Sequence, residues 1–154
     1  MRIISILQAL LTPVIGLIAL YIAWQQWKSN ELKLKMEKYD RRLRVYEEVV
    51  KMLQKVNRDF KPKWDDMLAF ATATAEADFL FGVEIPAYLD EIFSHANKLR
   101  LANMEYKAVT QLGRTGINLD QTVSELSLHS GWFTDQISSA KEKFKKYLYI
   151  ASRG

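Results

Sequence analysis

Cysteine is absent from this chain of 154 residues. Its absence excludes disulfide bonds and thiolate metal sites. Six glycines and three prolines are too few for a loop-rich β protein or a disordered chain. Leu, Ala, Lys and Glu, which are good helix formers, make up much of the remainder. We therefore expect an all-α protein with room for one membrane span and one domain.

Charged side chains are missing from residues 3–24, which read IISILQALLTPVIGLIALYIAW. As an α-helix this run would be roughly 33 Å long, close to the hydrocarbon core of a bilayer at about 30 Å. The run is longer than the apolar part of a signal peptide, and no small-residue cleavage motif follows it. The pattern predicts an uncleaved transmembrane anchor over residues 1–27.

Aromatic and basic residues follow the uncharged run. Tyr and Trp favour the boundary between lipid and water, and basic residues favour the cytoplasmic side. Seven basic and three acidic residues occupy positions 28–44, whereas Arg2 is the one basic residue on the other flank. We expect the N-terminus outside the cell inner membrane and residues 28–154 in the cytoplasm. The predicted membrane-interface anchors are Tyr21, Trp24, Trp27, Lys28, Lys33 and Lys35.

Small and polar residues recur within the uncharged run at spacings of three and four. At about 100° per residue they fall on one side of a helix, within an arc of roughly 80°. Such a stripe lets helices pack closely in lipid, although these residue types are common in any span. We expect a transmembrane interface between copies of the chain, made by Ser5, Gln8, Thr12, Gly16, Ala19 and Ala23.

Apolar periodicity and helix breakers divide the rest of the chain into four helices. The first continues from the span to about residue 60, the second covers 62–81, the third 86–112, and the fourth runs from a cap at Asn118 or Asp120 to about 151. The fold class predicted is an N-terminal transmembrane helix continuous with a cytoplasmic antiparallel four-helix bundle.

Each of these helices has a predicted inward side with spacings typical of bundles and coiled coils. In the first helix it comprises Leu32, Met36, Tyr39, Leu43, Tyr46, Val50, Leu53 and Phe60. In the second it comprises Trp64, Met67, Leu68, Ala71, Ala75 and Phe79. In the third it comprises Leu89, Ile92, Phe93, Ala96, Leu99, Tyr106 and Val109. In the fourth it comprises Leu119, Val123, Leu126, Ser130, Phe133, Ile137, Ala140, Phe144, Tyr147 and Ala151, with a bend near Ser130.

Two segments near the N-terminus carry a resemblance. Residues 21–28 read YIAWQQWK, and residues 34–46 read LKMEKYDRRLRVY, with an Asp-Arg-Arg-x-x-x-Tyr core. An N-terminal span, an aromatic and Gln cluster and this charged run are similar to those of short bacterial single-pass inner-membrane proteins of unknown function. The resemblance covers about the first 50 residues. It implies a bacterial single-pass protein with a cytoplasmic helical domain, and it implies no activity.

No catalytic, cofactor-binding or metal-binding motif is apparent. Glu91 and His95 lie four residues apart, but a metal would need further ligands, so we interpret them as a solvated polar face. His129 precedes Ser130, yet Ser-His chemistry would need an orienting carboxylate. The basic stretch 141–147 could contact RNA or anionic lipid, but its aromatic residues belong to the predicted inward side. Nucleic acid is therefore not the expected partner.

Two hypotheses about function follow. In the first, the chain is a non-enzymatic, membrane-anchored protein that self-associates through its span, and a membrane effector or pore-forming assembly is the strong form of this idea. In the second, it is a monomeric tether or adaptor that docks a soluble protein partner through its bundle. In both, the lipid bilayer is a partner.

Overall fold

The computed structural model describes the backbone of residues 2–149 and the side chains of residues 13–149. All secondary structure over these residues is helical, as the sequence predicts. The chain divides into two compact units, Met1–Lys38 and Tyr39–Gly154. Helix α1 is assigned from Arg2 to Asp59, so its end agrees with the predicted end near residue 60.

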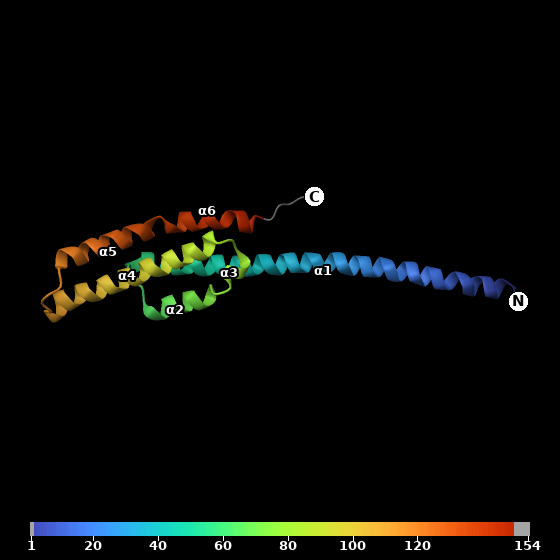
Figure 1. Cartoon of the computed structure of the whole chain (residues 1–154), viewed down its shortest axis with the longest axis horizontal. Coiled ribbons are helices and arrows are strands. Elements are labelled where there is room, and N and C mark those ends of the chain that lie inside the picture. Colours follow the sequence, from blue (N-terminus) through green and yellow to red (C-terminus); the bar gives the residue numbers. More distant parts are fainter. Residues whose placement is uncertain (1, 150–154) are drawn as a thin grey trace. The chain divides into compact units, whose positions relative to one another are not determined.

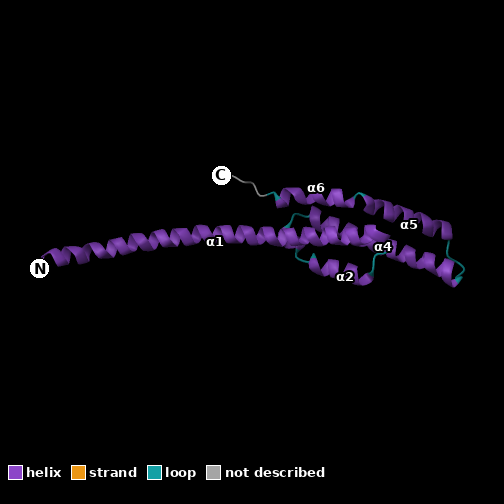
Figure 2. Ribbon diagram, turned by 180° about the vertical axis from the view of Figure 1, so that it is seen from behind, coloured by secondary structure: helices purple, strands orange, loops and turns teal. Residues whose placement is uncertain are grey.

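The second unit is a helical bundle. It contains the part of α1 after residue 38, followed by α2 (Trp64–Ala73), α3 (Ala77–Leu80), α4 (Glu84–Leu112), α5 (Leu119–Thr134) and α6 (Gln136–Leu148). The colours of Figure 1 show that the bundle part of α1 runs in the same direction as α4, and that α2, α5 and α6 run in the opposite direction. In Figures 1 and 2, α5 and α6 follow one another on one side of α4, and α2 lies on the other side.

The predicted inward side of α1 is confirmed at Leu53, which is fully buried, but it misses other core residues. Val45, Val49, Met52 and Val56 are buried, whereas Leu32 and Met36 are exposed. Leu32 and Met36 belong to the unit Met1–Lys38, so the predicted repeat was extended from two residues outside the bundle core.

The predicted helix over 62–81 is two helices. Thr74 ends α2 and donates its hydroxyl to the Phe70 carbonyl oxygen at 2.8 Å, and a turn leads into α3. Met67, which was predicted to face the core, is buried in α2, and so is Phe70. The turn changes the helical phase after Thr74, so Leu80 is buried in α3. Phe79, predicted to face the core, is 87% exposed.

Helices α4 and α5 form an antiparallel hairpin. Gly113 ends α4 in the left-handed conformation, with φ of 63°, which a residue without Cβ adopts at low cost. The Asn118 side chain caps α5 by accepting from the N–H groups of Asp120 and Gln121. The fourth predicted helix is interrupted at Asp135, not near Ser130, and this break separates α5 from α6.

An arginine from α1 fastens α6 to the α3–α4 connection. The Arg42 Nε donates to the Leu80 carbonyl oxygen at 2.9 Å, and its guanidinium lies over the rings of Phe81 and Tyr147. The Tyr147 hydroxyl accepts from the Gly82 N–H at 2.9 Å and donates to Glu84 at 2.6 Å. The Asp-Arg-Arg-x-x-x-Tyr segment thus has a packing role.

The membrane span predicted over residues 3–24 is not supported by the structure. Across the side chains that the structure describes, no helix is both long enough and apolar enough to cross a bilayer. Residues 3–12 of the predicted span lie outside that set of side chains.

Candidate functional site

The predicted stripe lies only partly within the described side chains. Ser5, Gln8 and Thr12 fall outside them. Gly16 and the two alanines Ala19 and Ala23 are exposed on α1. A Cβ built at Gly16 would meet no atom of the described chain within 4 Å. The surface of the unit Met1–Lys38 therefore leaves room for another helix at Gly16.

The predicted interface anchors form a local cluster on α1. The rings of Tyr21 and Trp24 lie 6.4 Å apart, and the Lys28 ammonium is 5.7 Å from the centre of the Trp24 ring. Lys35 pairs with Glu31 at 2.7 Å, one turn away. Trp27 and Lys33 are exposed. Apolar side chains between residues 14 and 22 are 47–70% exposed in this unit.

The two histidines of the chain meet between α4 and α5. The Nδ1 atoms of His95 and His129 are 3.0 Å apart, and His95 stacks on Trp132 with 4.1 Å between ring centres. His129 is buried, and its Nε2 lies 3.0 Å from a carboxylate oxygen of Glu125. The interpretation of His95 as part of a solvated face is therefore wrong.

These contacts define where protons must lie. A carboxylate only accepts, so the His129 Nε2 carries a proton and the Nδ1 of a neutral His129 accepts from the His95 Nδ1–H. Burial lowers the pKa of His95, and the charges of His129 and Lys98 lower it further, while Glu91 acts in the opposite direction. The neutral form of His95 is thus the one that suits this packing.

Neither nucleophilic nor metal chemistry is assembled at this pair. The Ser130 hydroxyl donates to the carbonyl oxygens of Leu126 and Ser127, not to His129. Within the described part of the chain, no group of three or more His, Cys, Asp or Glu side chains could hold a metal ion.

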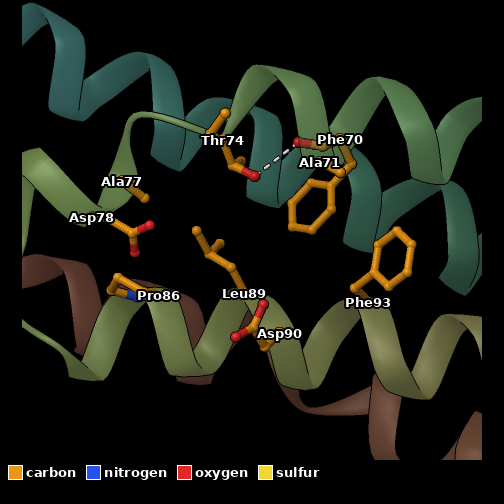
Figure 3. A pocket seen from close by; sticks show the side chains of 10 residues that line it. Phe70, Ala71, Thr74, Ala77, Asp78, Pro86, Leu89, Asp90 and Phe93 are labelled. Atoms are coloured by element: carbon orange, nitrogen blue, oxygen red, sulfur yellow. Dashed lines mark hydrogen bonds between the residues drawn. The ribbon is translucent and has the colours of Figure 1, made fainter.

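A cavity of about 320 Å³ lies between the α2–α3 segment and α4 (Figure 3). Phe70 and Phe93 contribute rings to its lining, and Asp78 and Asp90 contribute carboxylates. The hydrogen bond from Thr74 to the Phe70 carbonyl shapes one edge, as Figure 3 shows. Rings beside carboxylates are the chemistry that accommodates an organic cation.

A larger groove of about 620 Å³, which we call the basic groove, lies between the α1–α2 connection and α4. Basic residues line the groove both on the α1–α2 connection and on α4, and Asp59 is the one carboxylate in its lining. Its lining comprises Asp59, Lys61, Pro62, Lys63, Arg100, Asn103, Met104, Tyr106, Lys107, Gln111 and Leu126. Of the sites described, this groove is the candidate binding site.

Comparison of the chain with protein family profiles, curated protein sequences and solved structures finds no match. The assignment of a function therefore depends on residues and geometry alone.

Sequence reasoning missed both the histidine pair and the basic groove. His95 and His129 are 34 residues apart, and Lys61 and Lys107 are 46 apart, so no local pattern joins either set. One signal was present for the groove: basic residues are scarce between positions 61 and 112, and four of the five line it.

Proposed function

We propose that this chain is a non-enzymatic, membrane-anchored helical protein, with residues 1–27 as a single-pass anchor and residues 28–154 as a cytoplasmic bundle. The observation that carries the proposal is the apolar surface of α1 between residues 14 and 22, of which 47–70% of each large side chain is exposed. A helix that is apolar on every side is unfavourable in water, and hydrocarbon removes that cost. Together with residues 3–12, this surface is long enough for a bilayer.

The boundary of the proposed anchor is supported by its aromatic and basic residues. Tyr21 and Trp24 are close together, and Lys28 lies over the Trp24 ring. A Trp ring at the lipid headgroups with a lysine toward water is a common arrangement at membrane surfaces. The basic excess after residue 27 favours the cytoplasmic side for the bundle.

We further propose that the anchor self-associates through its stripe of small and polar residues. Gly16, Ala19 and Ala23 leave one side of the helix without bulk. Helices gain no hydrophobic free energy by pairing in lipid, so close packing and side-chain hydrogen bonds must provide it. The Gln8 amide, which is costly to leave unpaired in hydrocarbon, would contribute about 1 kcal/mol across such an interface.

The oligomeric state of the full chain in an uncharged detergent tests this proposal. We expect an oligomer for the wild type and dissociation for Gly16→Ile, because a branched side chain would push the backbones apart. Gln8→Leu should weaken the oligomer, since it removes the amide. Leu17→Ile, on the opposite side of the helix, is the matched control and should leave the mass unchanged.

A monomeric wild type would instead favour a tether or adaptor that docks a soluble protein through the bundle. The observation that favours this second function is a set of exposed apolar side chains on the α4–α5 hairpin, a kind of surface that protein partners can cover. These are Leu101, Met104, Leu112, Leu119, Val123 and Leu128. Substituting Leu112 and Leu128 by Ser in the monomer should then abolish capture of that partner without lowering stability.

A further inference from the structure

The basic groove is lined by cations although this part of the sequence contains more acidic than basic residues. Residues 61–112 contain eight acidic and five basic side chains, yet four of those five basic residues line one groove. None of the four has a carboxylate within ion-pairing distance among the described residues, whereas Lys51, Lys55 and Lys146 elsewhere in the bundle do. Unpaired cations that converge on a hollow create a positive potential that attracts anions.

Arg100 is held in place and lacks a strong acceptor. Its guanidinium lies over the Trp64 ring, 5.3 Å from the ring centre. One Nη donates to Asn97 Oδ1 at 3.1 Å, and the other faces the Met104 sulfur at 3.3 Å, which is a weak acceptor. Its Nε is buried without any partner in the described chain. A planar cation fixed in this way is suited to carboxylate or phosphate oxygens.

The backbone at the rim of the groove is strained. Phe60, at the end of α1, has φ of 50°, which is uncommon for a bulky residue. The Asn103 amide, which lies in the groove lining, donates to the Phe60 carbonyl oxygen at 2.8 Å and holds this conformation. The conformation directs the chain into Lys61, Pro62 and Lys63, which form one wall. Strain of this kind is often retained where it positions a binding surface.

The remaining lining is apolar or aromatic. Pro62, Met104 and Leu126 contribute apolar surface, and Tyr106 contributes a ring. The volume of about 620 Å³ falls in the usual range for small-molecule sites, about 300–1,000 Å³. Because cations and a ring share one hollow of this size, we infer that the basic groove binds a small phosphorylated molecule with an aromatic or apolar part, of nucleotide type. This inference does not depend on the membrane anchor.

Calorimetric titration of the full chain in an uncharged detergent tests the inference, with adenosine triphosphate as the probe. We expect saturable binding with one site per chain below about 1 mM. Tripolyphosphate should compete, because the cations recognise the phosphates. The single variants Lys61→Gln and Lys107→Gln should each weaken binding about fivefold, the effect of losing one partly exposed charge pair.

The matched control is the single variant Lys141→Gln on α6, which removes one positive charge outside the groove lining. It should bind as the wild type does, and thermal unfolding should show every variant folded. Absence of saturable binding would overturn the inference, as would equal weakening in the control. Binding of a polyglutamate peptide or a single-stranded RNA without binding of the nucleotide would overturn it in favour of a macromolecular partner.

Discussion

At the scale of single residues, Gly82 and Glu84 hold the end of α6 against the α3–α4 connection. A Cβ at Gly82 would lie 2.7 Å from the Tyr147 hydroxyl oxygen and 2.6 Å from a carboxylate oxygen of Glu84. The absence of a side chain at Gly82 therefore lets the Tyr147 hydroxyl reach the Gly82 N–H. Tyr147 and Lys146 both donate to Glu84, so one carboxylate fixes two residues of α6.

Replacing Glu84 by Gln should make the bundle less sensitive to acid. Hydrogen bonds from Lys146 and Tyr147 lower the pKa of Glu84 from 4.5 to about 2. Because the folded-state pKa is the lower one, the stabilisation is complete above pH 4.5 and is lost as the pH falls toward 2. The difference in melting temperature between wild type and Glu84→Gln should be constant above about pH 5.5 and shrink below pH 4.5.

Glu142→Gln removes an equal charge from an exposed position on α6 and serves as the control for this experiment. A difference between wild type and Glu84→Gln that stays constant down to pH 3 would contradict the role given to Glu84.

The histidine pair predicts a second, separate response to pH. Burial, His129 and Lys98 lower the pKa of His95 below 6.5, so its contribution to stability is present above pH 6.5 and is lost as the pH falls. If both rings were protonated, two N–H groups would point at each other across 3.0 Å. Chemical unfolding should therefore show wild-type stability declining as the pH falls below 6.5.

His95→Gln should flatten that decline, because its amide can still donate to His129 and does not titrate. The charged groups around the pair, which are Glu91, Lys98 and Glu125, remain in the variant. An equal slope in wild type and variant would show that another group controls stability in this pH range.

At the scale of helices, sequence periodicity identified the elements better than their inward sides. In α4 the predicted Leu89, Ile92, Ala96 and Leu99 are all buried, whereas the predicted Tyr106 is 41% exposed. In α1 the inward side was extended over three heptads and missed Val45, Val49 and Val56. Periodicity indicates which residues share a side of a helix, whereas the buried side depends on where other helices pack against it.

The breaks at Thr74 and Asp135 could not be located from sequence for a different reason. Neither is marked by glycine or proline, the residues that punctuate helices most strongly. At Thr74 the side chain competes for a backbone carbonyl, and at Asp135 the backbone leaves the helical region at ψ of 1°. The groove and the histidine pair depend on such tertiary details, so they too were missed.

The different burial of two predicted core leucines can be tested by truncation. Leu53 is fully buried, whereas Leu126 is partly buried and lines the basic groove. Leu53→Ala should lower the free energy of unfolding by about 2–5 kcal/mol, through lost burial and an unfilled cavity. Leu126→Ala should cost less, about 1–2 kcal/mol, because solvent can fill part of the space.

Lys141→Ala, on an exposed position of α6, should change the free energy of unfolding by less than about 0.5 kcal/mol. Denaturant unfolding of the full chain in detergent measures all three variants. Equal costs for Leu53→Ala and Leu126→Ala would contradict the burial difference.

At the scale of the whole molecule, an apolar helical segment and a helical bundle with its own core favour different environments. The side chains of α1 from residue 14 to 22 are apolar and exposed, whereas the bundle encloses its own core around Val49, Ile92 and Phe133. Residues 28–44 between them carry seven basic and three acidic side chains. A membrane would provide hydrocarbon for the apolar segment, lipid headgroups for the basic residues and water for the bundle.

The central claim, that residues 1–27 anchor a cytoplasmic bundle in the membrane, is tested by alkaline carbonate extraction of bacteria that express the chain. A fluorescent protein that folds only in the cytoplasm is fused after Gly154. We predict fluorescence that stays in the carbonate-washed membranes, and its release when residues 1–27 are deleted. Fluorescence of the full-length fusion in the carbonate supernatant, or a membrane-bound fusion that is dark, would contradict the account.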